Sequence, residues 1–492
     1  MKNQTPQHNF ELNRSSEELL YRQVYRRFKE AILSGTYPPG MRVPSIRTLA
    51  SELKLSRNTI ENAYDLLNGE GFFVSNGQAG TTIADLGFHQ LTPRPAQVEP
   101  KSAAARLTVR PFQIGVPALD AFPLSIWHTL CQRQLKSRHE ISQILSDVQG
   151  YLPLREAIAA YLSVSRGISC TPSRVFITSG YRQSMLLLAS TLLKAGDAVW
   201  IEDPSYPPAR QLFGKLGIRQ VPVPVDAEGM DVSEGVRLAP DARMALLSPA
   251  NQSPLGTVLS MSRRMALLSW AESHSAWLIE DDYDSEYCSD GRLLPTLSSL
   301  DRLGRTCYLG TFSKTLHPEL RLAYAVVPEG LVETVSETAG QLLDGCPLHE
   351  QKALATFIAD GHFGRHLKKM RTLYVRRREM LVEALQSRLA GHVHISPFSR
   401  GLCLLVYLAD DCDDVAIAQR ACAAGLSVAS LSPRATEDNH KRGLLLGFAN
   451  IVDAQSAEQD VETLAACLAT AELIPSGSLG RGRHFAGLEP AK

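Results

Sequence analysis

An apolar run leads directly into a polar, basic segment in the stretch Thr306-Cys-Tyr-Leu-Gly-Thr-Phe-Ser-Lys-Thr-Leu-His-Pro-Glu-Leu-Arg321. The apolar part predicts a buried strand that ends at Gly310, and the hydroxyl-rich part up to Lys314 predicts a loop. A lysine in a loop is in most proteins a solvated charge. Here, however, the flanking hydroxyls and the guanidinium of Arg321 suit a cofactor with an aldehyde and a phosphate. The lysine amine can form a Schiff base with the aldehyde, while the other groups bind the phosphate.

The segments on either side of this stretch alternate between short apolar runs and longer amphipathic ones. Such alternation predicts an α/β fold, with a mainly parallel sheet and helices on both of its faces. Ligands of these sheets lie at the carboxyl ends of the strands. The runs that predict strands are residues 175–180, 198–202, 244–248 and 276–280, and residues 184–194 predict a helix.

Polar motifs follow these predicted strands, where a ligand would lie. The motif Ser179-Gly-Tyr-Arg-Gln183 opens a helix, and the free backbone N–H groups of a helix start suit a phosphate. Tyr206 can stack on a planar ring, and Asn251 can donate a hydrogen bond to a phenolic oxygen. The motif Ile279-Glu-Asp-Asp-Tyr-Asp284 ends a strand, so one of its carboxylates can pair with a protonated ring nitrogen. Each motif taken alone is also compatible with an ordinary helix cap, turn or solvated acidic loop.

Composition narrows the classes of protein to which the chain can belong. Its 492 residues suggest two or three domains. The 51 basic and 51 acidic residues cancel, so bulk charge does not point to nucleic acid or to a membrane surface. Nine cysteines without paired or metal-ligand spacing favour reduced thiols and predict no metal site. The lack of a signal-like N-terminus and of a membrane-length apolar run predicts a cytoplasmic protein.

Residues 12–84 predict a small helical domain that ends in a β-hairpin. Ser15, followed three residues later by Glu18, has the pattern of a capping box before a first helix that stops at Ser34-Gly35. Ser56 is expected to cap a third helix. The second and third helices are predicted over residues 46–53 and 57–67, and β-prone runs over 72–74 and 81–83 flank Asn76-Gly77, which is a hairpin signal.

Two helices joined by a short turn and followed by a hairpin predict a winged helix-turn-helix, whose second helix of the pair reads DNA. The first turn of that helix presents arginine, asparagine and threonine, which reach base edges and phosphates. The alternative is a small packing domain with a solvated arginine face. The residues expected to contact DNA are Arg42, Arg47, Ser56, Arg57, Asn58 and Thr59, together with Gln78 and Thr81 of the wing.

Motifs in both parts of the chain carry a family resemblance. The N-terminal segments Tyr21-Arg-Gln23, Gly40-Met-Arg-Val-Pro-Ser-Ile-Arg-Thr-Leu-Ala50 and Leu55-Ser-Arg-Asn-Thr59 resemble the GntR-type DNA-binding domain. The motifs around Lys314, in their order along the chain, resemble fold-type-I pyridoxal-phosphate aminotransferases, and the two parts together resemble the MocR family of transcriptional regulators. Further matches to the second part are Gly150-Tyr-Leu-Pro-Leu-Arg-Glu-Ala157, Gly310-Thr-Phe-Ser-Lys-Thr-Leu316, Phe357-Ile-Ala-Asp-Gly-His362 and Met370-Arg-Thr-Leu-Tyr374.

The resemblance implies a domain organisation. A winged helix-turn-helix is expected over residues 12–84, and a proline-containing linker over 85–110. An aminotransferase-like domain, with a large subdomain and a C-terminal small one, is expected over 111–470. The tail over 471–492 is expected to be disordered.

The resemblance also implies a cofactor, pyridoxal 5'-phosphate (PLP), and a role for each site residue. Lys314 would carry the Schiff base and be the catalytic residue. Asp281 would meet the ring nitrogen and Tyr283 the ring hydroxyl, with Asn251 also near that hydroxyl, while Tyr206 would stack on the ring. The residues that would hold the phosphate are Tyr181, Arg182, Thr311, Ser313 and Arg321.

Two positions depart from the aminotransferase pattern. Ser253 stands where those enzymes have an asparagine, and Asn251 is the candidate to replace it. Leu445 stands where they have an arginine that binds the α-carboxylate of the substrate. Arg442 lies three residues earlier on the same predicted strand, which places it on the opposite face. Losing a bidentate carboxylate contact argues against productive transamination.

These observations support one leading hypothesis and leave two alternatives. The chain is expected to be a homodimeric, PLP-binding transcriptional regulator that binds an operator with repeats. It would sense PLP itself, or a small amine or amino acid, through Lys314, and Leu445 favours PLP as the effector. The first alternative is an active PLP-dependent aminotransferase. The second is a DNA-binding regulator whose pocket holds no cofactor.

Overall fold

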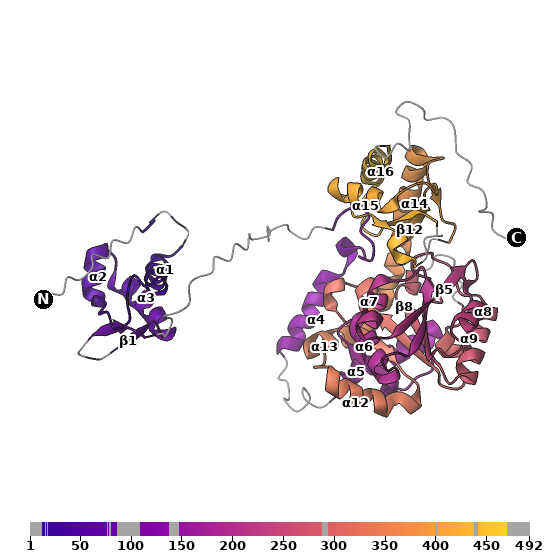
Figure 1. Cartoon of the computed structure of the whole chain (residues 1–492), viewed down its shortest axis with the longest axis horizontal. Coiled ribbons are helices and arrows are strands. Elements are labelled where there is room, and N and C mark those ends of the chain that lie inside the picture. Colours follow the sequence, from indigo (N-terminus) through magenta and orange to yellow (C-terminus); the bar gives the residue numbers. More distant parts are fainter. Residues whose placement is uncertain are drawn as a thin grey trace. The chain divides into compact units, whose positions relative to one another are not determined.

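The computed structural model describes residues 12–14, 16, 18–75, 77, 80–85, 109–136, 147–287, 294–398, 401–436 and 441–469. The chain divides into two compact units between residues 105 and 106, and each is described by itself (Figure 1). The linker expected over 85–110, apart from its ends, and the tail expected over 471–492 lie outside the described residues.

The N-terminal unit has the predicted winged helix-turn-helix. Its helices are α1 (Leu20–Leu33), α2 (Ile46–Leu53) and α3 (Arg57–Gly69). An antiparallel hairpin of β1 (Phe73–Ser75) and β2 (Thr81–Ile83) forms the wing. The predicted second helix is confirmed to the residue, and the third extends two residues beyond its predicted end.

Aromatic packing and two serine caps explain why these elements form. The ring of Phe28 meets the rings of Tyr64 and Phe73 edge to face, at centroid distances of 5.8 and 5.5 Å. Ser45 caps α2 by accepting a hydrogen bond from the backbone N–H of Thr48 at 3.1 Å. Ser56 caps α3 in the same way, as predicted, so the start of the recognition helix is fixed by its own sequence.

The predicted capping box at the start of the first helix is wrong. The helix begins at Leu20 with Leu19 as its N-cap residue, and Ser15 lies outside the described residues. The side chain of the buried Gln23 instead holds the preceding segment in a turn. Its amide nitrogen donates to the backbone oxygens of Asn13 and Glu18 at 2.9 and 2.8 Å, which competes with a helical continuation.

The C-terminal unit is built on an eight-stranded sheet of order β3-β10-β9-β8-β7-β4-β5-β6. The five strands from β9 to β5 pair in parallel, whereas β10 pairs antiparallel with both of its neighbours and β6 antiparallel with β5. All the predicted strands are present, and the mainly parallel α/β fold is confirmed. The bounds are β3 (Val175–Thr178), β4 (Ala198–Asp203), β5 (Arg219–Asp226), β6 (Gly229–Met230), β7 (Met244–Leu247), β8 (Trp277–Asp282), β9 (Thr306–Thr311) and β10 (Ala323–Val326).

Helices cover both faces of this sheet, as the alternation along β4 shows. Val199 and Ile201 pack into one hydrophobic cluster with residues of α6, α7 and α12. Ala198 and Trp200 pack into another, with residues of α8 and α9. Further helices, α4, α5 and α13, pack together beside the sheet. The bounds are α4 (Leu124–Lys136), α5 (Leu152–Arg166), α6 (Tyr181–Leu192), α7 (Pro207–Lys215), α8 (Val232–Leu238), α9 (Met261–Ser273), α10 (Leu297–Leu300), α12 (Val332–Leu342) and α13 (Leu348–Ala359).

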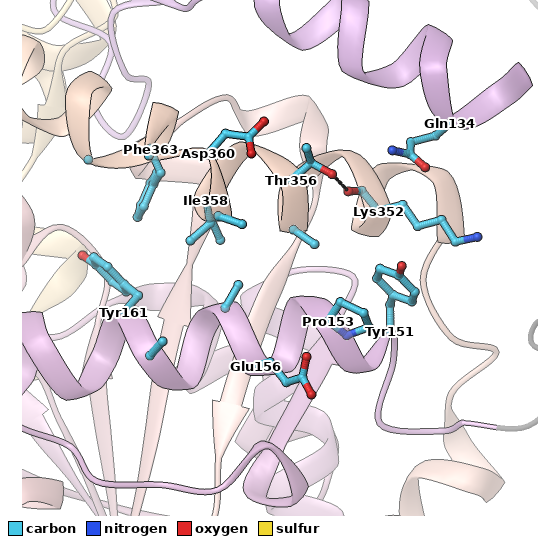
Figure 2. Close-up of a pocket in the computed structure, with 16 residues that line it drawn as sticks. Gln134, Tyr151, Pro153, Glu156, Tyr161, Lys352, Thr356, Ile358, Asp360 and Phe363 are labelled. Carbon is cyan, nitrogen blue, oxygen red and sulfur yellow. Dashed lines mark hydrogen bonds between the residues drawn. The ribbon is translucent and has the colours of Figure 1, made fainter. Parts of the chain in front are cut away.

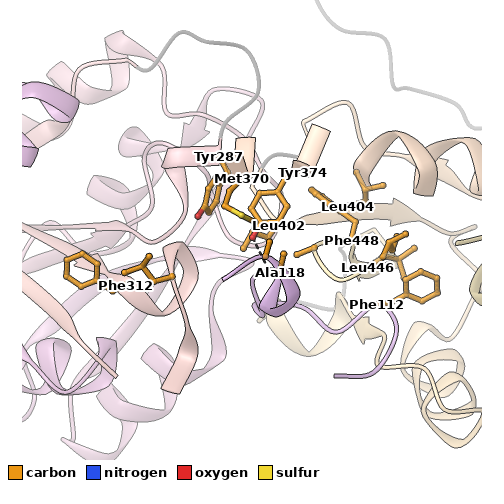
Figure 3. Packing of buried hydrophobic residues seen from close by; sticks show 14 of the residues in the cluster. Phe112, Ala118, Tyr287, Phe312, Met370, Tyr374, Leu402, Leu404, Leu446 and Phe448 are labelled. Carbon is orange, nitrogen blue, oxygen red and sulfur yellow. Dashed lines mark hydrogen bonds between the residues drawn. The ribbon is translucent and has the colours of Figure 1, made fainter. Parts of the chain in front are cut away.

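A four-stranded antiparallel sheet of order β11-β12-β14-β13 forms a small subdomain, with β12 drawn beside α14, α15 and α16 (Figure 1). One continuous core joins it to the large sheet: it runs from Phe312 through Met370 and Tyr374 to Phe448 (Figure 3). The bounds are α14 (His362–Leu389), β11 (His394–Ile395), β12 (Cys403–Tyr407), α15 (Asp414–Ala423), β13 (Ala429–Ser430), β14 (Gly443–Gly447) and α16 (Ala454–Leu468).

No helix among the described residues combines the length and the apolar character that crossing a membrane requires.

Candidate functional site

A cavity of about 430 Å³ lies at the carboxyl ends of the parallel strands, against the small subdomain. The structure brings every cofactor-contacting residue that the sequence predicted into the lining of this one cavity. These residues are Lys314, Asp281, Tyr283, Tyr206, Arg321, Ser313, Thr311, Tyr181, Arg182 and Asn251.

Lys314 lies on a one-turn helix, α11 (Phe312–Thr315), which corrects the prediction of a loop. Thr311, at the end of β9, starts this turn because its hydroxyl accepts a hydrogen bond from the backbone N–H of Ser313 at 3.2 Å. Burial lowers the pKa of the Lys314 amine, and the neighbouring Asp284 carboxylate opposes this effect. A lowered pKa increases the neutral, nucleophilic fraction of the amine.

A backbone oxygen from a distant part of the chain holds the Lys314 amine. Its Nζ donates a hydrogen bond to the oxygen of Gly115 at 2.6 Å. A Cβ atom at Gly115 would lie only 2.5 Å from that Nζ, and the residue has a φ of +75°. Another residue would be strained at this φ, and its Cβ atom would displace the flexible end of Lys314. Sequence reasoning missed Gly115, since nothing local to it signals a neighbour 199 positions away.

The acid-rich motif at the end of β8 divides between two environments because successive strand residues face opposite sides. Asp281 lines the cavity, and burial, followed by the charge of Asp282, raises its pKa to about 7. Glu280 and Asp282 point away from the cavity. Glu280 accepts backbone hydrogen bonds at the start of α10, and Asp282 pairs with the buried Arg166 at 2.9 Å. These anchors hold the strand end that presents Asp281.

Asp284 was not among the predicted site residues, although it lines the cavity. Its carboxylate accepts a hydrogen bond from Nδ2 of Asn251 at 2.7 Å, and burial raises its pKa to about 7. Tyr283 is half-buried beside it, and burial raises the pKa of its hydroxyl above the ordinary value. Asn251 therefore lies where the sequence placed it, but its amide already has a carboxylate partner.

Another set of lining groups is suited to a phosphate. The helix α6 starts here, with Gly180 at a φ of +104° and Tyr181 and Arg182 in its first turn. Its first backbone N–H groups have no helical partner, so they are available to an anion. Arg182 and Arg321 are exposed guanidinium groups, and both line the cavity with the hydroxyl residues Thr311 and Ser313.

These groups fit PLP. The cavity offers a half-buried amine for the aldehyde, a carboxylate for the ring nitrogen, an aromatic side chain for the ring, and a helix start with two arginines for the phosphate. The buried Asp281 also needs a cationic partner to ionise readily, which a protonated ring nitrogen would supply. No group of His, Cys, Asp and Glu side chains in the described part of the chain has the arrangement of a metal site.

The small subdomain forms one wall of the cavity, and this wall contains Leu445, the residue expected in place of the carboxylate-binding arginine of aminotransferases. Leu445 on β14 lines the cavity and is buried, so this position presents an apolar surface. Arg442 is absent from the lining, and its guanidinium donates to the hydroxyl of Ser432 at 2.8 Å. Arg434, from the 3-10 turn η8 (Ser432–Arg434), lines the cavity instead, and no local pattern in the sequence indicates this.

Most of the predicted DNA-contacting residues that the structure describes are exposed on the N-terminal unit. Arg57 and Asn58 are exposed in the first turn of α3, next to the cap residue Ser56, whose hydroxyl is 2.8 Å from that of Thr59. Arg42 is exposed and pairs with Thr82 of the wing through a β-bridge. Arg47 is exposed on α2, Thr81 is half-buried in the wing, and Gln78 lies outside the described residues.

Two family models match the chain. Residues 20–83 match the bacterial regulatory proteins of the gntR family, and residues 125–424 match aminotransferase class I and II.

Regulators similar to this chain match it over nearly its whole length. The probable rhizopine catabolism regulatory protein MocR of Rhizobium meliloti is 33% identical, over 96% of this chain and 98% of that protein. The HTH-type pyridoxine biosynthesis transcriptional regulator PdxR of Corynebacterium glutamicum is 31% identical, over 93% and 96%.

Solved aminotransferases are similar to the C-terminal unit. The α-aminoadipate aminotransferase LysN of Thermus thermophilus, complexed with N-(5'-phosphopyridoxyl)-L-leucine, is 26% identical with a TM-score of 0.67. The match covers 73% of this chain and 92% of that one. Kynurenine aminotransferase of Pyrococcus horikoshii is 25% identical with a TM-score of 0.66, over 74% and 92%.

Proposed function

The chain belongs to the MocR family, in which a GntR-type DNA-binding domain is joined to an aminotransferase-like domain that binds PLP, and from this membership we propose how it acts. It is a DNA-binding transcriptional regulator whose C-terminal unit senses PLP, or a small amine or amino acid, through Lys314. An active aminotransferase is not favoured, because the relatives that match the whole chain are transcriptional regulators.

One observation carries the proposal: a half-buried lysine amine, a buried carboxylate and the start of α6 line a single cavity. PLP, when bound, supplies an aldehyde that reacts with primary amines. Lys314 would provide the protein's own amine, kept in position by the oxygen of Gly115. Asp281 would hold a proton at the ring nitrogen, while Arg182 and Arg321 would bind the phosphate.

Gly115, which contacts the Lys314 amine, lies outside the strands and helices of the C-terminal unit. It belongs to the segment that follows the expected linker, and this segment is bound to the small subdomain. The backbone N–H of Gly447 donates to the oxygen of Phe112 at 2.9 Å, and that of Ala118 donates to the hydroxyl of Tyr374 at 3.0 Å (Figure 3). We propose that a change at the Lys314 amine shifts this segment. A ligand can bias such a switch only through different affinities for its two arrangements.

The proposed homodimer has a candidate contact surface on α4, α5 and α13. A groove of about 720 Å³ runs between α5 and α13, with Tyr161 at one end and Tyr151 at the other (Figure 2). Large apolar side chains are exposed nearby: Leu124 and Leu135 on α4, and Leu152 on α5, with exposed fractions of 67, 65 and 48%. Apolar surface of this kind is typical of an interface. Leu135→Glu is expected to shift the sedimentation coefficient toward that of a monomer.

The test of the sensing proposal is spectroscopic. Purified wild-type protein with PLP is expected to show the visible absorbance that PLP acquires when a lysine amine reacts with it. Lys314→Ala should lose this band entirely, whereas Lys215→Ala, at an exposed position on α7, should keep it. An unchanged spectrum in Lys314→Ala would remove Lys314 from the proposal.

A further inference from the structure

The charges that line the cavity do not all have a counterpart in a bound PLP. Its phosphate would use Arg182 and Arg321, its aldehyde would use Lys314, and its ring nitrogen would use Asp281. Asp284 already accepts a hydrogen bond from Asn251. One cation is left over. The six charged lining residues are Arg182, Asp281, Asp284, Lys314, Arg321 and Arg434.

Arg434 is the remaining cation among the lining residues. The guanidinium is half-buried and interacts electrostatically with Cys403, Tyr206 and Tyr283, none of which is charged at neutral pH. Burial lowers its pKa, which shows that its environment disfavours the charge. Within the described ranges, no carboxylate forms an ion pair with it. A charge taken out of water in this way is costly until a partner of opposite charge arrives.

The backbone around Arg434 is fixed from both sides of the cavity. Its carbonyl oxygen accepts a hydrogen bond from the backbone N–H of Ser205 at 2.9 Å and another from Arg210 at 3.2 Å. At the start of the same turn, the backbone N–H groups of Leu431 and Ser432 donate to the buried carboxylate of Asp414 at 3.1 and 3.0 Å. The turn therefore connects the large sheet to the small subdomain, and Arg434 is held in place between them.

Leu445 contributes to this arrangement. It packs in one buried cluster with Leu405 and with Leu431, the residue that directly precedes the turn of Arg434. Leu405 and Leu445 also line the cavity, so an apolar wall adjoins the charged groups. A ligand whose amine reached the aldehyde of a PLP bound at Lys314, and whose other end reached Arg434, would lie along this apolar wall.

We propose that Arg434 binds the carboxylate of an amino-acid effector, so that the pocket selects amines that also carry this anion over plain alkylamines. The proposal rests on the proposed function, because it assigns the effector class of the same cavity. A planar guanidinium can hold a carboxylate with two parallel hydrogen bonds, which gives direction as well as affinity. Because the turn contacts both subdomains, an effector bound here would also favour one arrangement of them.

The test compares amines of equal length with and without a carboxylate on the full-length, PLP-loaded protein. Glycine, β-alanine and 4-aminobutyrate are titrated beside methylamine, ethylamine and propylamine. Dissociation constants are read from the change in the visible spectrum and, independently, from the shift in Tm. At least one carboxylated amine should bind wild-type protein roughly tenfold to a hundredfold more tightly than its plain counterpart. Arg434→Gln should bring this ratio close to one, because the carboxylated amines lose their additional contact.

Two further variants distinguish the loss of the contact between Arg434 and the carboxylate from a general loss of folding. Arg388→Gln changes an exposed arginine on α14, outside the cavity, and should behave like wild type. Arg434→Lys should recover part of the preference, because the charge is kept without the planar geometry. A full preference in Arg434→Gln, or no preference in wild-type protein that shows the PLP band, would overturn the assignment of Arg434. A wild-type protein without that band would instead overturn the proposed function.

Discussion

In the N-terminal unit the candidate ligand-contacting side chains stand in water, whereas in the C-terminal unit they lie in a cavity. Arg42, Arg57 and Asn58 are exposed, and the sequence around them forms ordinary caps and turns. In the cavity, Asp281 and Asn251 are only 8 and 5% exposed. DNA is a long polyanion that meets a surface, so the N-terminal residues can keep full hydration until it binds. PLP is small, and the pocket must surround it.

This difference in burial determines how each unit responds to a substitution or to a change in pH. Burying charges shifts pKa values and ties the binding of a ligand to the stability of the fold, as the values of about 7 for Asp281 and Asp284 show. Exposed charges contribute little to folding and act mainly through phosphate contacts that salt weakens. Substitutions in the pocket should therefore change stability and its pH dependence, whereas substitutions on the surface of the N-terminal unit should mainly change DNA affinity.

The largest effect expected in the N-terminal unit comes from Arg57→Ala. Loss of one guanidinium contact to a base or phosphate costs about 1–3 kcal/mol, so DNA affinity should fall roughly tenfold to a hundredfold in a mobility-shift titration. The visible PLP band should stay unchanged, because the pocket does not use this residue. Arg27→Ala, which changes an exposed arginine on α1, serves as the control. An equal loss in both variants would mean that general charge, and not the start of α3, governs binding.

Asp281→Asn tests whether a buried carboxylate in the cavity makes the stability of the protein depend on pH. Because the folded pKa is raised to about 7, the folded state without PLP holds more protons than the unfolded state between pH 4 and 7. The stability that the protonated group provides is present at low pH and is lost as the pH rises through 7. The variant, which cannot ionise, should thus be more stable than wild type at pH 8 by about 1 kcal/mol or more, and similar to it at pH 4.

Thermal unfolding of the PLP-free protein at both pH values measures this difference. Asp410→Asn, at an exposed position, should show no such dependence. If Asp281→Asn and wild type differ by the same amount at pH 4 and pH 8, ionisation of Asp281 does not destabilise the pocket.

The smallest expected effect is a difference in DNA affinity between variants of two helix caps in the N-terminal unit. Ser45→Ala and Ser56→Ala each remove one side-chain cap, so each should lower the unfolding free energy by about 1 kcal/mol. Only Ser56 lies at the start of α3, the proposed DNA-contacting turn. At a temperature where both variants are folded, Ser56→Ala should bind DNA a few-fold more weakly than Ser45→Ala. Equal affinities would place the contact elsewhere on the unit.

Local patterns were sufficient to predict much of the fold. The alternation of apolar runs predicted the parallel strands, and the cap residue Ser56 predicted where α3 begins. The predicted cap of the first helix was wrong because Gln23 binds backbone groups as far away as Asn13, and a capping-box pattern does not indicate such a contact. The short helix at Lys314 was missed because a four-residue segment with three polar side chains, Ser313, Lys314 and Thr315, is equally compatible with a loop.

The predicted part of the pocket also reflects local signals at strand ends, where Asp281, Tyr206 and Lys314 were all found in the lining. Gly115 and Arg434 were not predicted because chain crossings that no local pattern encodes bring them to the cavity. Gly115 reaches Lys314 across 199 positions, and the turn of Arg434 is fixed by Ser205 and Asp414. Both belong to segments outside the large sheet that line the cavity. The sequence of such a segment can predict its local turn, but it does not predict which distant residues the turn contacts.

The most direct test of sensing through Lys314 is the binding of wild-type protein and Lys314→Ala to the DNA upstream of this gene. Mobility shift and footprint are measured without PLP, with PLP alone, and with PLP and the amine panel. The account predicts that at least one of these additions changes the affinity or the extent of the footprint for wild-type protein and leaves Lys314→Ala unchanged. A wild-type footprint that responds to none of them, or a Lys314→Ala variant that responds as wild type does, would contradict it.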